Sequence, residues 1–179
     1  MNTWPNAVIT NKGLALQAKL IEGHTLNITR AVAGTAYVQP VLLLQQTDIS
    51  DIKQTLKFKK VSYPEEGKSA VPMFLTNEGL ATGYIATQIG VFAEDPDEGE
   101  ILYFISQAES GKGTEVPSET EMPGYHAEWT FYFQYGNADG VSVTVDPAHT
   151  ISEEEALILI KENALPFDAA VAYLALDKE

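Results

Sequence analysis

The segment HAEWTFYFQY at 126–135 restricts the fold of this chain more than any other stretch of it. Successive side chains of a β-strand point to opposite faces, so Glu128, Thr130, Tyr132 and Gln134 would share one face. The other face is almost entirely apolar, a pattern typical of a half-buried strand. We therefore predict a strand here, with one face formed by Ala127, Trp129, Phe131, Phe133 and Tyr135.

Several other segments have strand patterns separated by short turns. The sequence DPDEGE at 95–100 lies between YIATQIGVFA (84–93) and ILYFISQA (101–108) and predicts a hairpin. GNADG leads from the strand at 126–135 into VSVTV, whereas Pro72 within VPMFL predicts an edge strand. Few helices interrupt this series, so we expect an α+β, mainly β fold with an antiparallel sheet or sandwich. Further strands are predicted at 26–32, ending at Gly34, and at 55–61.

One helix is expected near the start of the chain. Thr10 is a typical N-cap for a helix over residues 11–22, which would carry Leu14, Ala18 and Ile21 on one face. The apolar run PVLLLQQ, which begins at Pro40, is too short to distinguish a helix from a buried strand.

The composition changes after Pro147, and we expect a β-rich domain over residues 1–147 followed by a helical tail over 148–179. The segment SEEEALILIKENA predicts a capped helix, and FDAAVAYLAL predicts a second one after Pro166. Residues 156–160 are apolar on all sides, unlike a lone surface helix. They would be buried against another subunit or against their own domain. The candidate assembly surface therefore consists of Leu157, Ile158, Leu159 and Ile160.

Charge and composition exclude several classes of protein. The net charge is −14 and Arg30 is the single arginine, so the cationic surface that nucleic acid requires is missing. The acidic residues are concentrated in residues 94–179. They would form either a solvated surface or a docking face for a basic partner. The absence of cysteine excludes disulfides and thiolate chemistry. The sequence has neither a signal-peptide pattern nor an apolar run of the ~20 residues that span a bilayer, so we expect no membrane insertion.

The loop ESGKGTEVPS at 109–118 has a superficial likeness to a phosphate-binding loop. A Walker-type loop needs an earlier glycine, where Ser106 stands, and a Ser or Thr directly after the lysine, where Gly113 stands. Pro117 also prevents the helix that would direct N–H groups at a phosphate. We therefore interpret this segment as a polar loop.

No other pattern indicates a catalytic or metal site. DPDEGE departs from a calcium loop because Gly99 occupies its fifth position, so we interpret it as a turn. His24, His126 and His149 lack the spacing of zinc ligands. We expect no cofactor and no enzymatic activity.

Three segments, in order, resemble the N-terminal region of phage tail-collar fibre proteins. They are ITNKGLALQAKLIEGHTLNITRAVAG, ATGYIATQIGVFAEDPDEGEILYFISQ and MPGYHAEWTFYFQYGNADGVSVTVDP. The first resembles the T-N-x-G start of that family, and the second its IGxFAxDPDEGEILY hairpin. The resemblance covers roughly residues 4–150 and implies turn and backbone roles for Gly13, Gly34, Gly90, Gly99 and Gly124.

The resemblance implies a structural function. Such domains attach a fibre to the baseplate or collar of a phage-like tail, and the fibres are usually trimeric. We accordingly expect a homotrimer that binds baseplate or fibre proteins, is made in the bacterial cytoplasm and resides in the tail particle. Many members continue into a shaft and receptor-binding tip, whereas this sequence stops about 30 residues after Pro147. Attachment is therefore favoured over receptor recognition.

Two other functions stay open at this point. A carbohydrate- or cell-surface-binding module would expose Trp4, Tyr125, Trp129 or Tyr132 on one surface. A small hydrolase would need two carboxylates with separated pKa values in a pocket.

Overall fold

The computed structural model describes residues 4–21, 25–65, 68–134 and 143–145. The expected tail over 148–179 lies outside these ranges. The helices are α1 (Asn11–Ile21) and the 3₁₀-helix η1 (Pro40–Gln45). The strands are β1 (Asn6–Ile9), β2 (Leu26–Gly34), β3 (Ile52–Phe58), β4 (Ser62–Glu65), β5 (Lys68–Thr76), β6 (Tyr84–Ala86), β7 (Gln88–Asp95), β8 (Gly99–Gln107), β9 (Thr114–Val116), β10 (His126–Gln134) and β11 (Val143–Val145).

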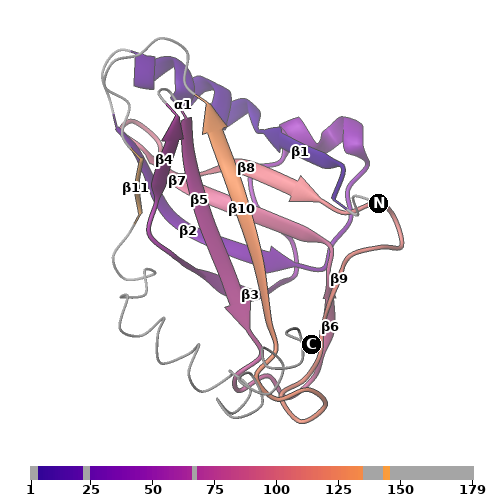
Figure 1. The fold of residues 1–179 in the computed structure, drawn as a ribbon. Coiled ribbons are helices and arrows are strands. Elements are labelled where there is room, and N and C mark those ends of the chain that lie inside the picture. Colours follow the sequence, from indigo (N-terminus) through magenta and orange to yellow (C-terminus); the bar gives the residue numbers. More distant parts are fainter. Residues whose placement is uncertain (1–3, 22–24, 66–67, 135–142, 146–179) are drawn as a thin grey trace, which may run out of the picture.

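The main sheet is mostly antiparallel and curls over on itself. Its strands follow the order β1-β8-β7-β2-β3-β5-β10, with β4 added to β5 and β11 added to β2. Strands β6 and β9 form a separate two-stranded sheet. Because β3 pairs with both β2 and β5, it joins two layers, and β5 and β10 cross over β2, β7 and β8 (Figure 1). The expected mainly β, antiparallel fold with an N-terminal helix is confirmed.

The alternation predicted for β10 is confirmed in the described part of the strand. Phe133 is buried, Trp129 and Phe131 are partly buried, and Tyr132 on the opposite face is 70% exposed. The inward rings contact the other layer: the Phe131 and Phe104 centroids are 4.7 Å apart, and those of Phe133 and Tyr103 are 5.6 Å apart.

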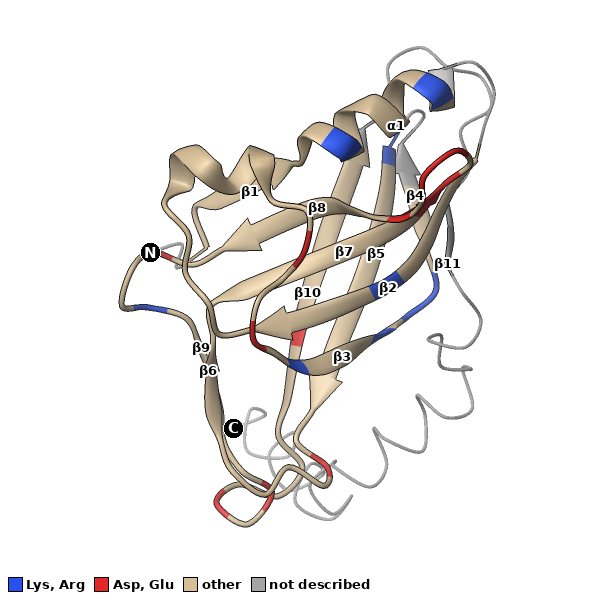
Figure 2. Ribbon diagram, turned by 180° about the vertical axis from the view of Figure 1, so that it is seen from behind, with Lys and Arg blue, Asp and Glu red and all other residues tan. Residues whose placement is uncertain are grey.

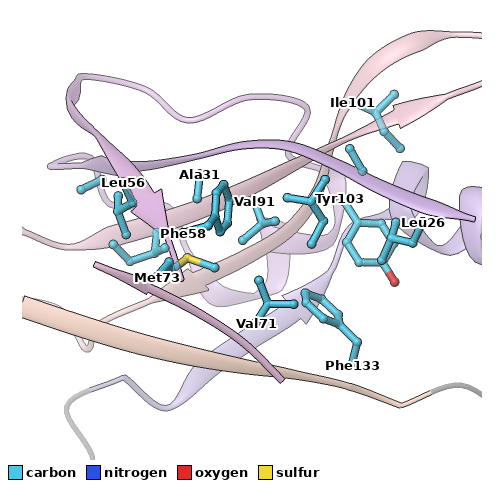
Figure 3. Close-up of a cluster of buried hydrophobic side chains, with 14 of the residues drawn as sticks. Leu26, Ala31, Leu56, Phe58, Val71, Met73, Val91, Ile101, Tyr103 and Phe133 are labelled. Atoms are coloured by element: carbon cyan, nitrogen blue, oxygen red, sulfur yellow. The ribbon is translucent and has the colours of Figure 1, made fainter. Parts of the chain in front are cut away.

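The core lies between the two layers. Figure 3 shows Val71, Met73 and Phe133 of one layer pointing toward Val91 and Tyr103 of the other. All five side chains are at most 4% exposed. Burial of apolar area on this scale is the main source of stability for a chain without disulfides.

A β-bulge in β8 adjusts the register at the centre of this core. Val91 of β7 pairs with Phe104 and Phe92 pairs with Leu102, which leaves Tyr103 as an extra residue. A bulge changes the direction of the side chains beside it. Tyr103 and its neighbour Phe104 consequently both contact Phe133 of β10.

The predicted hairpin around DPDEGE is confirmed, with β7 and β8 paired from Gln88↔Gln107 to Asp95↔Gly99. The predicted strand at 84–93 is divided, however. Residues 84–86 pair with β9, and the main sheet resumes only at Gln88. Between them, the Thr87 N–H donates to the Gly34 carbonyl and the Thr87 carbonyl accepts from Ala108, both at 2.9 Å.

The prediction of an edge strand at Pro72 is wrong, because β5 lies between β3 and β10. The Pro72 carbonyl accepts the Lys59 N–H at 2.9 Å, just beyond the end of β3. In an antiparallel strand the N–H and C=O of one residue point to the same side. The proline nitrogen therefore faces the short segment between the end of β3 and the start of β4. Since it does not face β10, β5 loses no ladder hydrogen bond to β10.

The described part of the VSVTV strand that follows GNADG, β11, does not lie beside β10, which pairs with β5. Strand β11 pairs in parallel with β2, with Val143 opposite Leu26 and Val145 opposite Ile28. The GNADG residues and Tyr135 lie outside the described ranges.

Helix α1 begins as predicted but buries a different face. The Thr10 hydroxyl accepts the Gly13 N–H at 3.0 Å, which is an N-cap. Leu14 is 49% exposed, whereas Leu16 and Leu20 are at most 2% exposed and join the core. The helix is rotated relative to our prediction because its first turn lies directly on the β8 bulge, where the Thr10 N–H donates to the Tyr103 carbonyl at 3.0 Å.

Gly13 permits this close approach of α1 to β8, and its replacement provides a first test. A Cβ atom at Gly13 would collide with the Tyr103 carbonyl and lie 2.7 Å from Cγ2 of Ile9. We expect Gly13→Ala to lower the free energy of unfolding by about 1–3 kcal/mol through overpacking, although alanine favours a helix by ~1 kcal/mol elsewhere. Chemical denaturation measures this difference. Ala18→Gly, at an exposed position of α1, measures propensity alone; a Gly13→Ala protein as stable as the wild type would contradict the steric argument.

Candidate assembly surface

The segment 109–118 begins with a turn, as expected, but it is not a loop throughout, because Thr114–Val116 form β9. The Lys112 N–H donates to the Glu109 carbonyl at 2.9 Å, and the lysine ammonium forms an ion pair with the Glu109 carboxylate. The chain then enters β9 rather than a helix. The lysine is therefore held by a carboxylate of its own turn, and no helix N-terminus is present there to bind a phosphate.

The DPDEGE segment is confirmed as a turn, and its carboxylates hold α1. Oδ1 of Asp95 accepts the N–H groups of Asp97 at 2.9 Å and Glu98 at 3.2 Å. The Lys19 ammonium lies 2.7 Å from both Asp95 and Asp97. Lys12 forms a second ion pair between α1 and this turn, with Glu98 at 2.6 Å. Among the described residues no group of three or more His, Cys, Asp or Glu side chains could hold a metal ion.

The aromatic residues proposed for a sugar site are mostly turned inward. Trp4, Tyr125 and Trp129 are partly buried and contact the core, and the two indole rings meet edge to face at 6.0 Å. Tyr132 is the one of the four with a largely exposed ring. The four residues therefore do not form a shared exposed surface.

The sequence-predicted assembly surface, Leu157, Ile158, Leu159 and Ile160, lies outside the described residues. Another apolar surface is present in the described part of the chain, on the loop of residues 35–51 that contains η1. Tyr37, Val41, Leu42 and Leu44 are 45%, 73%, 40% and 42% exposed. We call these four residues the η1 surface. Within the described ranges, no helix is both long and apolar enough to cross a membrane.

The loop that carries the η1 surface is anchored by a buried amide. The Gln107 side chain binds both backbone groups of Val38: its Oε1 accepts the N–H at 2.9 Å and its Nε2 donates to the carbonyl at 2.7 Å. Nε2 of Gln88 donates to the same Oε1 at 2.7 Å. Both glutamines are at most 1% exposed. Thr87 adds a hydrogen bond from its hydroxyl to the Ala36 carbonyl at 2.6 Å.

Apolar contacts fix the same loop to the outer face of the sheet. Leu43 and Ile49 are at most 3% exposed and pack with Val32, Phe92, Leu102 and Ile105. The Ile49 side chain occupies the space that side chains at Gly34 and Gly90 would fill. A Cβ atom at Gly34 would lie 2.6 Å from Cγ2 of Ile49, and a Cβ atom at Gly90 would lie 2.8 Å from Cδ1 of Ile49. Leu43 therefore anchors η1, while its neighbours Leu42 and Leu44 face solvent.

The η1 surface also contains no charge. No Asp, Glu, Lys or Arg occurs between Thr35 and Thr47, in a chain of which 20% of the residues are charged. Figure 2 shows η1 without basic or acidic residues, on the side of β7 and β8 that faces away from β5 and β10. Sequence reasoning missed this surface, because the uncharged apolar run after Pro40, its one signal, fits a buried element equally well.

The ion pair between Lys19 and Asp95 predicts a pH dependence. Asp95 is 2% exposed, and the Lys19 ammonium, helped by the Asp97 and Glu98 N–H groups, holds its pKa below the usual 3.8. A depressed carboxyl pKa contributes stability above the unfolded pKa that is lost as the pH falls through the folded pKa. We expect Asp95→Asn to lower the urea midpoint at pH 7 and the difference from wild type to shrink below about pH 3.8.

The control for this prediction is Asp97→Asn, because the Asp97 side chain contacts the same lysine but is 75% exposed. Exposed ion pairs contribute little, so this variant is expected to match the wild type closely at both pH values. Equal effects of the two substitutions would contradict the assignment of Asp95 as the buried anchor of α1.

Comparison of the chain with family models, with curated proteins and with solved structures gave no match. The functional interpretation therefore depends on the residues and geometry described above, together with the resemblance of the three sequence segments.

Proposed function

We propose that this chain is a non-enzymatic structural component of a phage or phage-like tail that attaches a tail fibre to the baseplate or collar. The observation that carries the proposal is the ordered resemblance of three segments, residues 9–34, 81–107 and 122–147, to the N-terminal region of tail-collar fibre proteins. The described fold supports it in two ways.

The first support is that the three segments meet in one structural unit. The first contacts the second where Thr10 bonds the Tyr103 carbonyl and where Lys19 binds Asp95. The second contacts the third where Phe104 packs edge to face on Phe131. Because the three segments pack against one another, the sequence pattern of each depends on the other two. A protein that shares this fold is therefore expected to share all three patterns, as the resemblance describes.

The second support comes from the glycines within those segments. Gly13, Gly34 and Gly90 lie where a Cβ atom would collide with a neighbouring strand or with Ile49. Gly99 and Gly124 have positive φ angles of 78° and 77°. Each glycine therefore has a backbone reason that is independent of any ligand, which favours a shared fold over a shared active site.

In the proposed function the chain forms a homotrimer within the tail particle. It binds baseplate or fibre proteins and needs no cofactor or nucleic acid. The runner-up, a carbohydrate- or cell-surface-binding module, has less support because Trp4, Tyr125 and Trp129 are partly buried.

The mass of the purified chain in solution tests the oligomeric part of the proposal. Light scattering across a range of concentrations is expected to give about three times the 19.5 kDa of one chain. The same sample in denaturant provides the single-chain reference. A mass of one chain at every concentration would contradict the trimer.

Electron microscopy tests the location. Phage-like particles from the bacterium that encodes this chain are labelled with gold-conjugated antibody raised against the purified protein. Label is expected at the end of the tail where fibres join the baseplate or collar, and antibody pre-absorbed with the purified chain serves as the control. Fibre-bearing tails without label at that end would overturn the proposed function.

A further inference from the structure

We infer that the η1 surface is the site where copies of this chain contact one another around a symmetry axis. The occupant of the surface is a second copy of the chain, which brings its own Tyr37, Val41, Leu42 and Leu44 to the contact. The inference rests on the self-association included in the proposed function and is independent of the assignment to a phage tail.

The first argument is that buried groups hold the backbone of the η1 surface in one conformation. A loop without a partner exposes polar residues and tolerates local motion. The η1 loop instead exposes four large apolar side chains while buried groups hold its backbone from below. Gln107 binds both backbone groups of Val38, and Leu43 and Ile49 are buried. A preformed backbone loses little conformational entropy on binding, which favours association.

The ends of the loop are joined as well. The Thr35 N–H donates to the Asp51 carbonyl at 3.3 Å, and the Thr35 hydroxyl bonds the Asp51 carboxylate. The exposed apolar residues therefore lie on a closed loop whose base is fixed, and Val41 in η1 is 73% exposed. Rigid apolar side chains that protrude in this way are typical of the centre of an interface.

The second argument is charge, and it selects the occupant. Copies with a net charge of −14 repel one another unless they meet at a neutral face. Thr35 to Thr47 is free of charged residues, and the centres of interfaces are depleted of charge. A basic partner would instead be attracted to carboxylates, which this surface does not contain. The η1 surface therefore suits another copy of the same acidic chain.

The third argument is position. Figures 1 and 2 place η1 beside β1 and near the start of α1, away from the layer formed by β5 and β10. In a closed cyclic oligomer, a patch on the axis contacts the same patch of the neighbouring copies. The η1 surfaces of several copies can thus converge while their β5–β10 layers stay apart, and Val41 of one copy lies close to Val41 of the next.

The absence of cysteine permits a sharp test by cross-linking. Val41→Cys introduces a single thiol on the η1 surface, and Tyr132→Cys introduces one at a similarly exposed position (70%) on the other layer. Under mild oxidation of dilute protein, we expect Val41→Cys to form covalent dimers at least about ten times faster than Tyr132→Cys, because disulfide formation requires close Cα approach. Equal rates would overturn the inference.

A charge substitution tests the same contact without a cross-link. Val41→Asp places like charges together at the proposed axis, so light scattering is expected to show dissociation at protein concentrations at least about tenfold higher than for wild type. Tyr132→Asp is expected to leave the mass unchanged. Circular dichroism and the unfolding midpoint confirm that both variants are folded, since both positions are exposed.

The outcomes separate this inference from the proposed function. An oligomer that persists in Val41→Asp, with slow cross-linking of Val41→Cys, would place the contact elsewhere, for example at Leu157 to Ile160, and would overturn only the inference. Protection of the Val41→Cys thiol from maleimide without cross-linking would show that residues 148–179 of the same chain, or a different protein, cover the surface. That result would also overturn it, as would a wild-type protein that is monomeric at every concentration.

Discussion

The extra residue in β8 is the constraint on which the rest of the fold depends. At the register shift between Val91 and Phe92, the Tyr103 ring turns to Phe133 of β10, and the Tyr103 carbonyl accepts the Thr10 N–H at 3.0 Å. The Leu102 carbonyl accepts the Thr10 hydroxyl at 2.5 Å. One local irregularity therefore joins the second layer of the sheet on one side and the start of α1 on the other.

On the outer face of the sheet, where the η1 loop lies, buried polar groups hold the chain in place. Burying the amides of Gln88 and Gln107 is unfavourable unless their hydrogen bonds are satisfied, and here the two amides bind each other and the backbone of Val38. The Gln107 amide binds Val38 as the backbone of a neighbouring strand would. The η1 loop is thus attached to the sheet almost as an additional strand, although its own sequence is apolar. Its conformation is determined from beneath, which leaves Val41, Leu42 and Leu44 free to serve a contact outside the chain.

The features predicted correctly from sequence are those determined by neighbouring residues. The alternation around Trp129, the Thr10 cap and the DPDEGE turn each depend on a few consecutive positions. The wrong predictions concern relations between distant segments: the central place of β5 despite Pro72 depends on where β3 ends, and the rotation of α1 depends on the β8 bulge. The η1 surface was not predicted because an uncharged apolar run suggests burial, and only the buried Gln107 shows that the run is held at the surface.

In the fold, the uneven distribution of charge along the chain gives ion pairs between the earlier and the later half of the sequence. Residues 1–93 carry a balance of +2 and residues 94–179 a balance of −16. Five described ion pairs join the two parts: Lys12–Glu98, Lys19–Asp95, Lys19–Asp97, Arg30–Glu100 and Lys59–Glu128. Lys12, Lys19, Arg30 and Lys59 thus hold α1, β2 and the end of β3 to later parts of the chain. Since the surplus of the later half is negative, the repulsion between two copies is smallest where neither sign is present. The contact between copies that we propose at the neutral η1 surface is in accord with this charge distribution.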